Sequence, residues 1–153
     1  MAVKKKMPAN KKAERGKNKT VVESKQVKPA HPKPLRKISK AQKFQLDLIA
    51  RTNFNSCDGV KIANLLKDNR QMWRAVFMPL NSYSLRDLEK GIWHADMLHI
   101  YAEESYEYAL EELVREQFDA DEISWTSGID AVVMIGTPEV KHRTNVILSA
   151  WWD

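Results

Sequence analysis

Residues 97–117 read MLHIYAEESYEYALEELVREQ, and this stretch decides the fold class. Its first five residues form a compact apolar run, which predicts a β-strand over 97–101. Residues 103–117 then predict an amphipathic helix, because Tyr106, Leu110, Leu113, Val114 and Gln117 share one helical face. A strand that leads directly into such a helix indicates an α+β fold with the helix packed on a sheet.

Three further strands are predicted after this stretch, at 123–125, 131–135 and 145–152. Gly128 and Gly136 bound the second of them. The last two strands are expected to form a hairpin across a loop near residues 139–143. The resulting sheet is predicted to be small and antiparallel or mixed, with helix 103–117 packed on it.

The chain before this stretch predicts a helical N-terminal half. Ser39 with Gln42 fits a capping box, and Asp58 is expected to cap a second helix. Residues 52–56 have the composition of a loop. The sequence thus predicts helices over 39–51 and 58–69, a strand over 73–78, and a short helix that opens at Ser84 with Asp87.

Charge divides the chain of 153 residues into two parts. Residues 1–50 hold 15 Lys and Arg against three Asp and Glu, a net charge of +12, whereas residues 51–153 hold 10 against 17, a net charge of −7. Residues 1–37 have no Leu, Ile, Phe, Trp or Tyr before Leu35, so they cannot bury enough apolar surface to offset the entropy of ordering. We expect 1–37 to be a disordered Lys-rich arm that ends in a proline linker, and 38–153 to be a single α+β domain.

The arm is the predicted contact with nucleic acid or a nucleoprotein. Flexible lysines neutralise phosphates without fixed geometry, and the arm has no aromatic residue on which a base could stack. The alternatives are a solubilising tail, a contact with an acidic protein, or an arm that covers its own acidic body. The residues expected to contact nucleic acid are Lys4, Lys5, Lys6, Lys11, Lys12, Arg15, Lys17 and Lys19.

The predicted helix 103–117 carries six glutamates against one cation, Arg115. Its acidic face is interpreted as solvated or as a docking face for a protein or for the arm, with Glu104 and Glu111 as partner-binding residues. The pairs in Glu103-Glu104-x-x-Glu107 and Glu116-x-x-Asp119 resemble those that hold magnesium in helical nucleotide pyrophosphohydrolases. In that family the two pairs lie on separate helices, whereas both fall on one helix here, and we expect no metal site.

Histidine, cysteine and tryptophan supply the remaining candidate residues. Cys57 lies just before a predicted helix, whose N-terminus can lower the pKa of a thiol. Trp151 and Trp152 cannot both point inward from one strand, so the C-terminus is a predicted partner or oligomer surface. For an enzyme, the residues expected to act are Glu104, Glu107, His94, Asp96 and His99.

No apolar run is long enough for a transmembrane helix or a secretory signal, and the one cysteine suits a reducing compartment, so we expect a cytoplasmic protein. No phosphate loop, dinucleotide-binding fingerprint or nucleophile elbow occurs, and no cofactor is expected. The favoured hypothesis is a non-enzymatic accessory protein, whose arm contacts nucleic acid while the acidic body docks a protein partner. The alternatives are a small metal-dependent enzyme acting on nucleotides or nucleic acid, and an autoinhibited interaction module.

Overall fold

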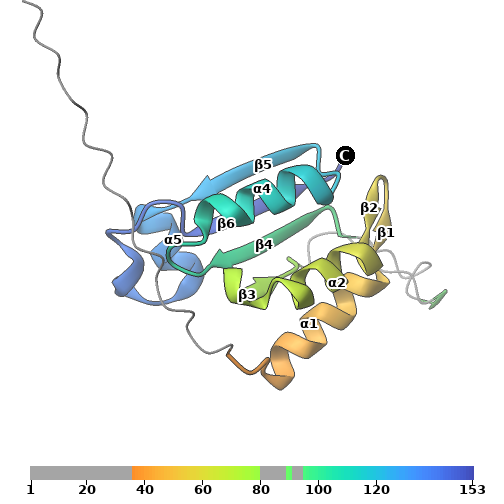
Figure 1. Cartoon of the computed structure of the whole chain (residues 1–153), viewed down its shortest axis with the longest axis horizontal. Helices are drawn as coiled ribbons and strands as arrows, with labels where there is room; N and C mark the ends of the chain where they lie inside the picture. Colours follow the sequence, from red (N-terminus) through yellow and green to blue (C-terminus); the bar gives the residue numbers. More distant parts are fainter. Residues whose placement is uncertain (1–35, 80–88, 91–94) are drawn as a thin grey trace, which may run out of the picture. The chain divides into compact units, whose positions relative to one another are not determined.

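The computed structural model of the protein describes residues 36–79, 89–90 and 95–153 (Figure 1). The described residues belong to one compact unit. Residues 1–35 of the predicted arm, the short helix expected at Ser84 and the candidate His94 lie outside the described residues. Within them the fold class is α+β, as predicted.

Helices and strands are interspersed along the described part of the chain. Two helices and a short hairpin come first, and the second half inserts two helices between the strands. The order is α1 (Lys40–Arg51), β1 (Asn53–Phe54), β2 (Cys57–Asp58), α2 (Gly59–Asp68), a 3-10 turn (Arg70–Met72), β3 (Trp73–Phe77), β4 (Met97–Ala102), α4 (Glu107–Gln117), β5 (Glu122–Thr126), α5 (Gly128–Ile135), a 3-10 turn (Pro138–Val140) and β6 (Ile147–Trp151).

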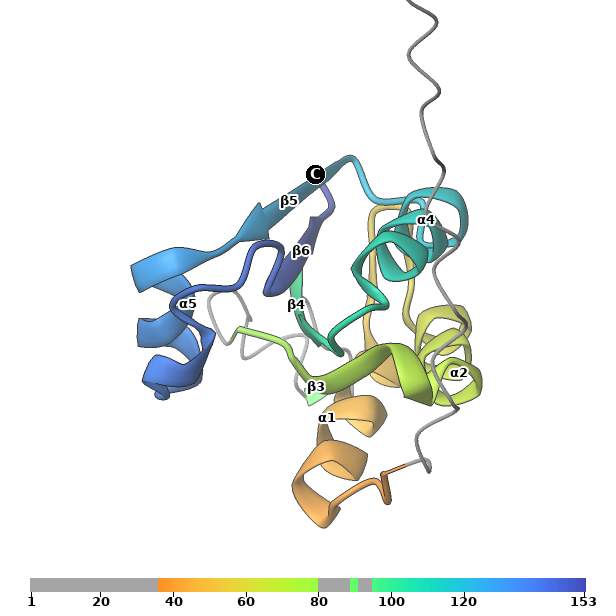
Figure 2. The same cartoon turned by 60° about the vertical axis from the view of Figure 1, so that its left-hand side comes forward.

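The main sheet has four strands in the order β3-β4-β6-β5, and every neighbouring pair is antiparallel. Figure 2 shows α1, α2 and α4 on one side of this sheet and α5 on the other. The first side is the core face, and we call the other the α5 face. The strands expected at 73–78, 97–101, 123–125 and 145–152 are confirmed, and the sheet is antiparallel rather than mixed.

Side chains of β4 alternate between the two faces of the sheet, and this alternation defines the core face. Leu98, Ile100 and Ala102 are fully buried, whereas the residues between them lie on the α5 face and are partly exposed. The buried residues that meet them from the helices are Leu46 and Ile49 of α1, Ile62, Ala63 and Leu66 of α2, and Leu110 and Val114 of α4. This continuous apolar cluster holds the three helices on one face of the sheet.

The predicted helix caps are present, with one difference. The Ser39 hydroxyl accepts the backbone N–H of Gln42, and the Asp58 carboxylate accepts that of Lys61. The side chain of Gln42 does not return to Ser39, as a capping box requires, but hydrogen-bonds the backbone of Val76 in β3. Tertiary contact with an edge strand therefore replaces the local bond.

The helix predicted over 103–117 begins only at Glu107. Residues before it form a turn in which Ser105 has a φ of 75°. Glu103 leaves the helix because its carboxylate pairs with Arg74 and its backbone N–H donates to the carbonyl of Met72. Contacts with β3 and with the 3-10 turn before it thus override the helical propensity of the first four residues.

The strand predicted over 131–135 is wrong, and so is the hairpin that it was to form. Residues Gly128–Ile135 are the helix α5, which ends at Gly136 with a φ of 77°. A glycine in this left-handed conformation is a common helix C-terminal cap. Strand β6 instead pairs with β4 and β5, and α5 with the turn Pro138–Val140 fills the connection between β5 and β6.

The segment expected to be a loop at 52–56 contains part of the two-stranded hairpin β1–β2. This hairpin joins α1 to α2, which approach each other closely at Gly59. A Cβ atom at Gly59 would lie 1.9 Å from the carbonyl oxygen of Ile49, so only glycine fits there.

Candidate functional site

The α5 face of the sheet holds a groove between the strands and α5. Ala75, Phe77, His99 and Tyr101 line it from β3 and β4, Met134 and Ile135 line it from α5, and Ile147 lines it from β6. The cavity has a volume of about 240 Å³. Its lining is apolar except for His99 and the Tyr101 hydroxyl, so it suits an apolar side chain better than a charged ligand.

Large hydrophobic side chains are exposed beside this groove. The exposed fractions are 49% for Phe77, 62% for Ile129, 75% for Val133 and 47% for Met134. Phe77 and Met134 line the groove together, and Ile129 and Val133 lie one helical turn apart on α5. We call these four residues the α5 patch. Adjacent exposed apolar residues of this size are typical of protein-binding surfaces.

His99 is the titratable residue of the groove. Its Nδ1 and the Oγ of Ser149 share a hydrogen bond of 2.8 Å, and its ring is stacked on Phe77 with 6.5 Å between the ring centroids. Burial lowers the pKa of His99 below its ordinary value of 6.5, so the imidazole is neutral at pH 7.

A serine next to a neutral histidine can act as a nucleophile where a third group orients the histidine. Among the described residues, the hydrogen bond of His99 is to Ser149, and no carboxylate contributes to its pKa shift. Asp96 uses its backbone carbonyl to accept the N–H of Trp152. Within the described residues, the pair His99–Ser149 therefore offers a hydrogen-bonding group to a ligand without the orienting carboxylate of a catalytic triad.

A second hollow lies on the same face, beside Ser149. Met97, Glu122, Ser124, Ser149 and Trp151 line it, and its volume is about 260 Å³. The partner candidate Trp151 is thus partly exposed on the α5 face. Trp152 is instead buried in the core, where its indole N–H donates to the carbonyl of Phe118 over 3.1 Å. The alternation predicted for the two tryptophans is present, and Trp151 is the one left on the surface.

Ion pairs hold the turn before α4. Arg74 makes two hydrogen bonds to the carboxylate of Glu103, over 3.0 and 3.1 Å, and a third to the Tyr101 hydroxyl. The Glu103 carboxylate raises the pKa of Arg74. Arg143 pairs with Glu107 over 3.1 Å. Two of the glutamates in the magnesium-like pattern are thus engaged by arginines of their own chain.

The other two acidic candidates, Glu104 and Glu111, do not come together with the first two. Glu104 is exposed, whereas Glu111 accepts the indole N–H of Trp125 and pairs with Arg115. These two contacts, Trp125 first, hold the pKa of Glu111 below its ordinary value. Among the described residues, no three His, Cys, Asp or Glu side chains gather as a metal site would require.

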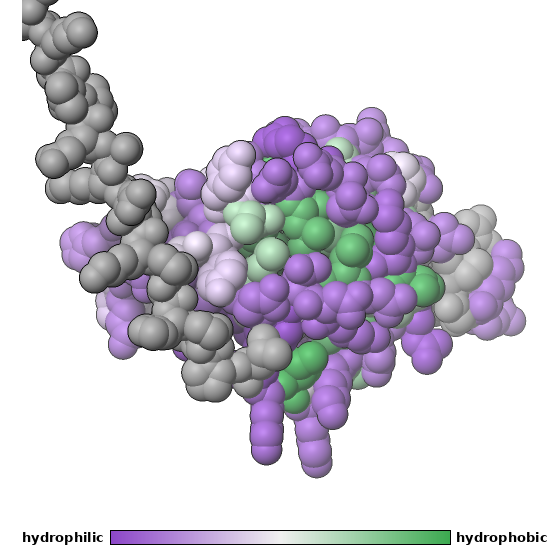
Figure 3. Space-filling model, viewed as in Figure 1, coloured by the Kyte–Doolittle hydropathy of each residue, from purple (hydrophilic) through white to green (hydrophobic). Residues whose placement is uncertain are grey.

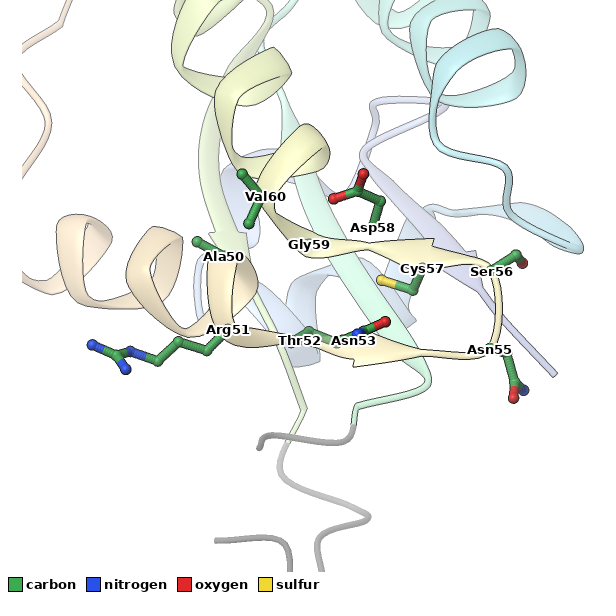
Figure 4. Close-up of a pocket in the computed structure, with 10 residues that line it drawn as sticks. All are labelled: Ala50, Arg51, Thr52, Asn53, Asn55, Ser56, Cys57, Asp58, Gly59 and Val60. Carbon is green, nitrogen blue, oxygen red and sulfur yellow. The ribbon is translucent and has the colours of Figure 1, made fainter. Parts of the chain in front are cut away.

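Cys57 is buried, and burial followed by the nearby Asp58 raises the pKa of its thiol to about 12. The helix N-terminus therefore does not make Cys57 a reactive thiol, because desolvation disfavours the thiolate. A hollow of about 400 Å³ lies at this hairpin. Figure 4 shows Arg51, Asn55 and Asp58 pointing away from one another there, so these polar groups do not converge on a ligand.

Sequence reasoning missed the α5 patch and the arginines that hold the α4 turn. The signal for α5 was present, since Gly128 and Gly136 are eight residues apart and Ser127 is a typical N-cap residue. No sequence signal joins Phe77 to Met134, because the order of strands brings them together.

Comparison with known proteins found no matching family, no similar curated protein and no similar solved structure. Among the residues that the structure describes, none of the helices is long and apolar enough to cross a bilayer.

Proposed function

We propose that this chain is a non-enzymatic accessory protein, whose Lys-rich arm contacts nucleic acid or a nucleoprotein while the acidic body docks a protein partner. The observation that carries the proposal is the division of charge between arm and body. Residues 1–37 hold 13 Lys and Arg against two Glu, and this net charge of +11 has no role in forming an apolar core, whereas flexible lysines bind phosphates readily.

The body is a poor surface for phosphate. Arg115 is the one cation in the sequence between residues 103 and 122. Figure 3 shows that hydrophilic residues surround a hydrophobic area at the centre of the face that carries α4. The exposed carboxylates of this region are Glu104, Glu112, Glu116, Asp119, Asp121 and Glu122. Their negative potential repels nucleic acid and favours partners with neutral or basic surfaces.

The α5 patch is the surface of the body best suited to a protein. It combines exposed aliphatic side chains with a groove that can take an anchor residue, which is the usual composition of an interface centre. Trp151 extends the same face toward β5.

Affinity capture from native lysate, with and without nuclease, tests both parts of the proposal. The baits are the intact protein, a form lacking residues 1–35, and the variant Val133→Lys. Val133 is exposed, so the substitution should leave the fold intact while placing a charge at the centre of the α5 patch. Asn64→Lys, at an exposed position on α2, is the matched control.

The proposal predicts two separable losses. Nuclease and arm deletion should each remove the nucleic-acid-dependent material, and Val133→Lys should remove a nuclease-resistant protein that Asn64→Lys retains. Capture that is unchanged by arm deletion and by Val133→Lys would contradict the proposal.

A further inference from the structure

The two edges of the main sheet differ in how they are protected. At β3, the Gln42 side-chain amide donates to the carbonyl of Val76 over 2.9 Å and accepts the N–H of Val76 over 2.7 Å. Gln45 accepts the N–H of Met78 over 3.2 Å. Side chains of α1 therefore occupy the outer hydrogen-bonding groups of this edge, which natural proteins must cover to prevent pairing.

The other edge, β5, lies at the outer margin of the sheet, and no described element is drawn beyond it (Figure 1). The direction of its backbone groups follows from its neighbours. The N–H of Trp152 donates to the carbonyl of Asp96 just before β4, whereas the carbonyl of Trp151 accepts the N–H of Asp121 just before β5. Even-numbered residues of β6 therefore face β4, and the odd-numbered ones face β5.

The pairing of β5 with β6 shows which backbone groups of β5 point toward the sheet and which point away. Ser149 of β6 is opposite Ser124, so the backbone of Ser124 points inward to β6, as do those of Glu122 and Thr126. Ile123 and Trp125 then direct their N–H and C=O groups away from the sheet. Among the described residues, none bonds to these outward groups.

We propose that β5 pairs antiparallel with β5 of a second copy of this chain, about a two-fold axis at Ser124. This pairing would join two four-stranded sheets into one continuous sheet. A closed two-fold contact uses the same patch on both subunits, so the strand must be complementary to itself.

The sequence of β5 meets this requirement. Turning Glu122–Thr126 about Ser124 sets Ile123 opposite Trp125 of the partner subunit, Glu122 opposite Thr126 of the partner subunit, and the two Ser124 side chains opposite each other. Apolar residues face each other on the core face, and no like charges meet. An axis at Glu122 instead would set two carboxylates face to face.

The backbone fits the same register. The outward N–H of Ile123 reaches the outward carbonyl of Trp125 of the partner subunit, and the reverse bond forms beside it. The two-fold axis repeats both bonds, giving four hydrogen bonds on the two sides of the Ser124 pair. The dimer would present two basic arms to one nucleic acid, but the pairing itself uses neither the arm nor the α5 patch.

Variants of the full-length chain that carry a charge at Ser124, on the two-fold axis, test the proposal. In a pair without direct backbone bonds the two Ser124 Cα atoms would lie about 4.5 Å apart. Ser124→Lys and Ser124→Glu should each raise the dimer dissociation constant at least about 3-fold, because each puts like charges at that spacing. An equimolar mixture of the two variants should restore association through Lys–Glu pairs.

Sedimentation equilibrium of each protein and of the mixture measures these constants. Ser124 is exposed, so both variants should keep the melting temperature of the parent, and Asn64→Lys should keep its dissociation constant. A second measurement needs no variant. In the unmodified chain, exchange of the Ile123 and Trp125 amide hydrogens should slow as protein concentration rises, whereas that of Ser124 should not change.

The proposal is overturned if the unmodified chain stays monomeric up to about 1 mM, the weakest constant that would matter in a cell. It is also overturned if Ser124→Lys dimerises as tightly as the parent, or if the mixture associates no better than its components. Concentration-independent exchange at Ile123 and Trp125 would overturn it as well, even if a variant failed to fold.

Discussion

The imidazole of His99, on the α5 face, makes the stability of the fold depend on pH. Because burial lowers its pKa below 6.5, the unfolded chain binds a proton at this residue more readily than the folded chain does. The contribution of His99 to stability is therefore full above pH 6.5 and is lost as the pH falls through the lower folded-state pKa.

We expect the melting temperature to fall between pH 7 and pH 5, and His99→Asn to reduce this fall. An asparagine amide retains a hydrogen bond to Ser149 without titrating. Thermal unfolding at a series of pH values measures the effect, with His142→Asn at an exposed position as the control. An unaltered pH profile in His99→Asn would show that His99 is not the group responsible.

Cys57 provides a second test at the residue scale. A thiol with a pKa of about 12 has almost no thiolate at pH 8, so it should resist a disulfide-exchange reagent in the folded protein. Full reaction is expected in denaturant, where the pKa returns to its ordinary value. Rapid labelling of the native protein would mean that the hairpin β1–β2 opens readily or that the thiol is not buried.

At the scale of elements, α4 is fixed by the residues that it buries. Leu110 is fully buried, whereas Leu113 is partly buried at the margin of the same cluster. Leu110→Asp should cost several kcal/mol, enough to unfold a domain whose total stability is about 5–15 kcal/mol. Leu113→Asp should cost less, and Glu112→Gln, at an exposed position, should be nearly silent.

Chemical denaturation of the three variants measures these free energies. A Leu110→Asp protein as stable as the parent, or a larger loss for Leu113→Asp, would contradict the orientation of α4 on the sheet.

The elements also show which parts of the fold a sequence can predict. The face of α4 was predictable because its apolar spacing extends over three turns, far beyond what chance produces. The run 131–135 was not, because five apolar residues fit a buried strand and a helix equally well. That error concealed the α5 patch, because an apolar strand at 131–135 would have buried Val133 and Met134 on the two faces of the sheet.

Of the candidate site, the sequence predicted single residues but not their neighbours. The exposure of one tryptophan at the C-terminus followed from alternation along a strand, and Trp151 is that residue. The contact of His99 with Ser149 joins residues 50 positions apart, so it depends on the register of β4 with β6. The open edge at β5 likewise depends on strand order, which no local pattern encodes.

For the whole molecule, the central claim is that the arm binds nucleic acid and the body does not. Residues 36–153 hold 14 basic and 18 acidic residues, so the chain lacking residues 1–35 has a net charge of −4. A surface of that sign should repel phosphates at low salt, where charge effects act over the longest range.

Sequence order within the arm should matter little for this binding. Contacts to phosphate supply affinity without reading bases, and flexible lysines have no fixed geometry with which to read them. An arm of the same composition in scrambled order should therefore bind as the natural arm does.

The most direct measurement is a salt titration of binding to fluorescent duplex and single-stranded oligonucleotides by the intact chain, the chain lacking residues 1–35, and the chain with the scrambled arm. With about 4–6 lysines on duplex phosphates, the logarithm of affinity should fall with the logarithm of salt at a slope of roughly −4 to −5 for the intact and scrambled chains. The truncated chain should not bind at any salt concentration. Equal binding by the intact and truncated chains would place the site on the body and contradict the account.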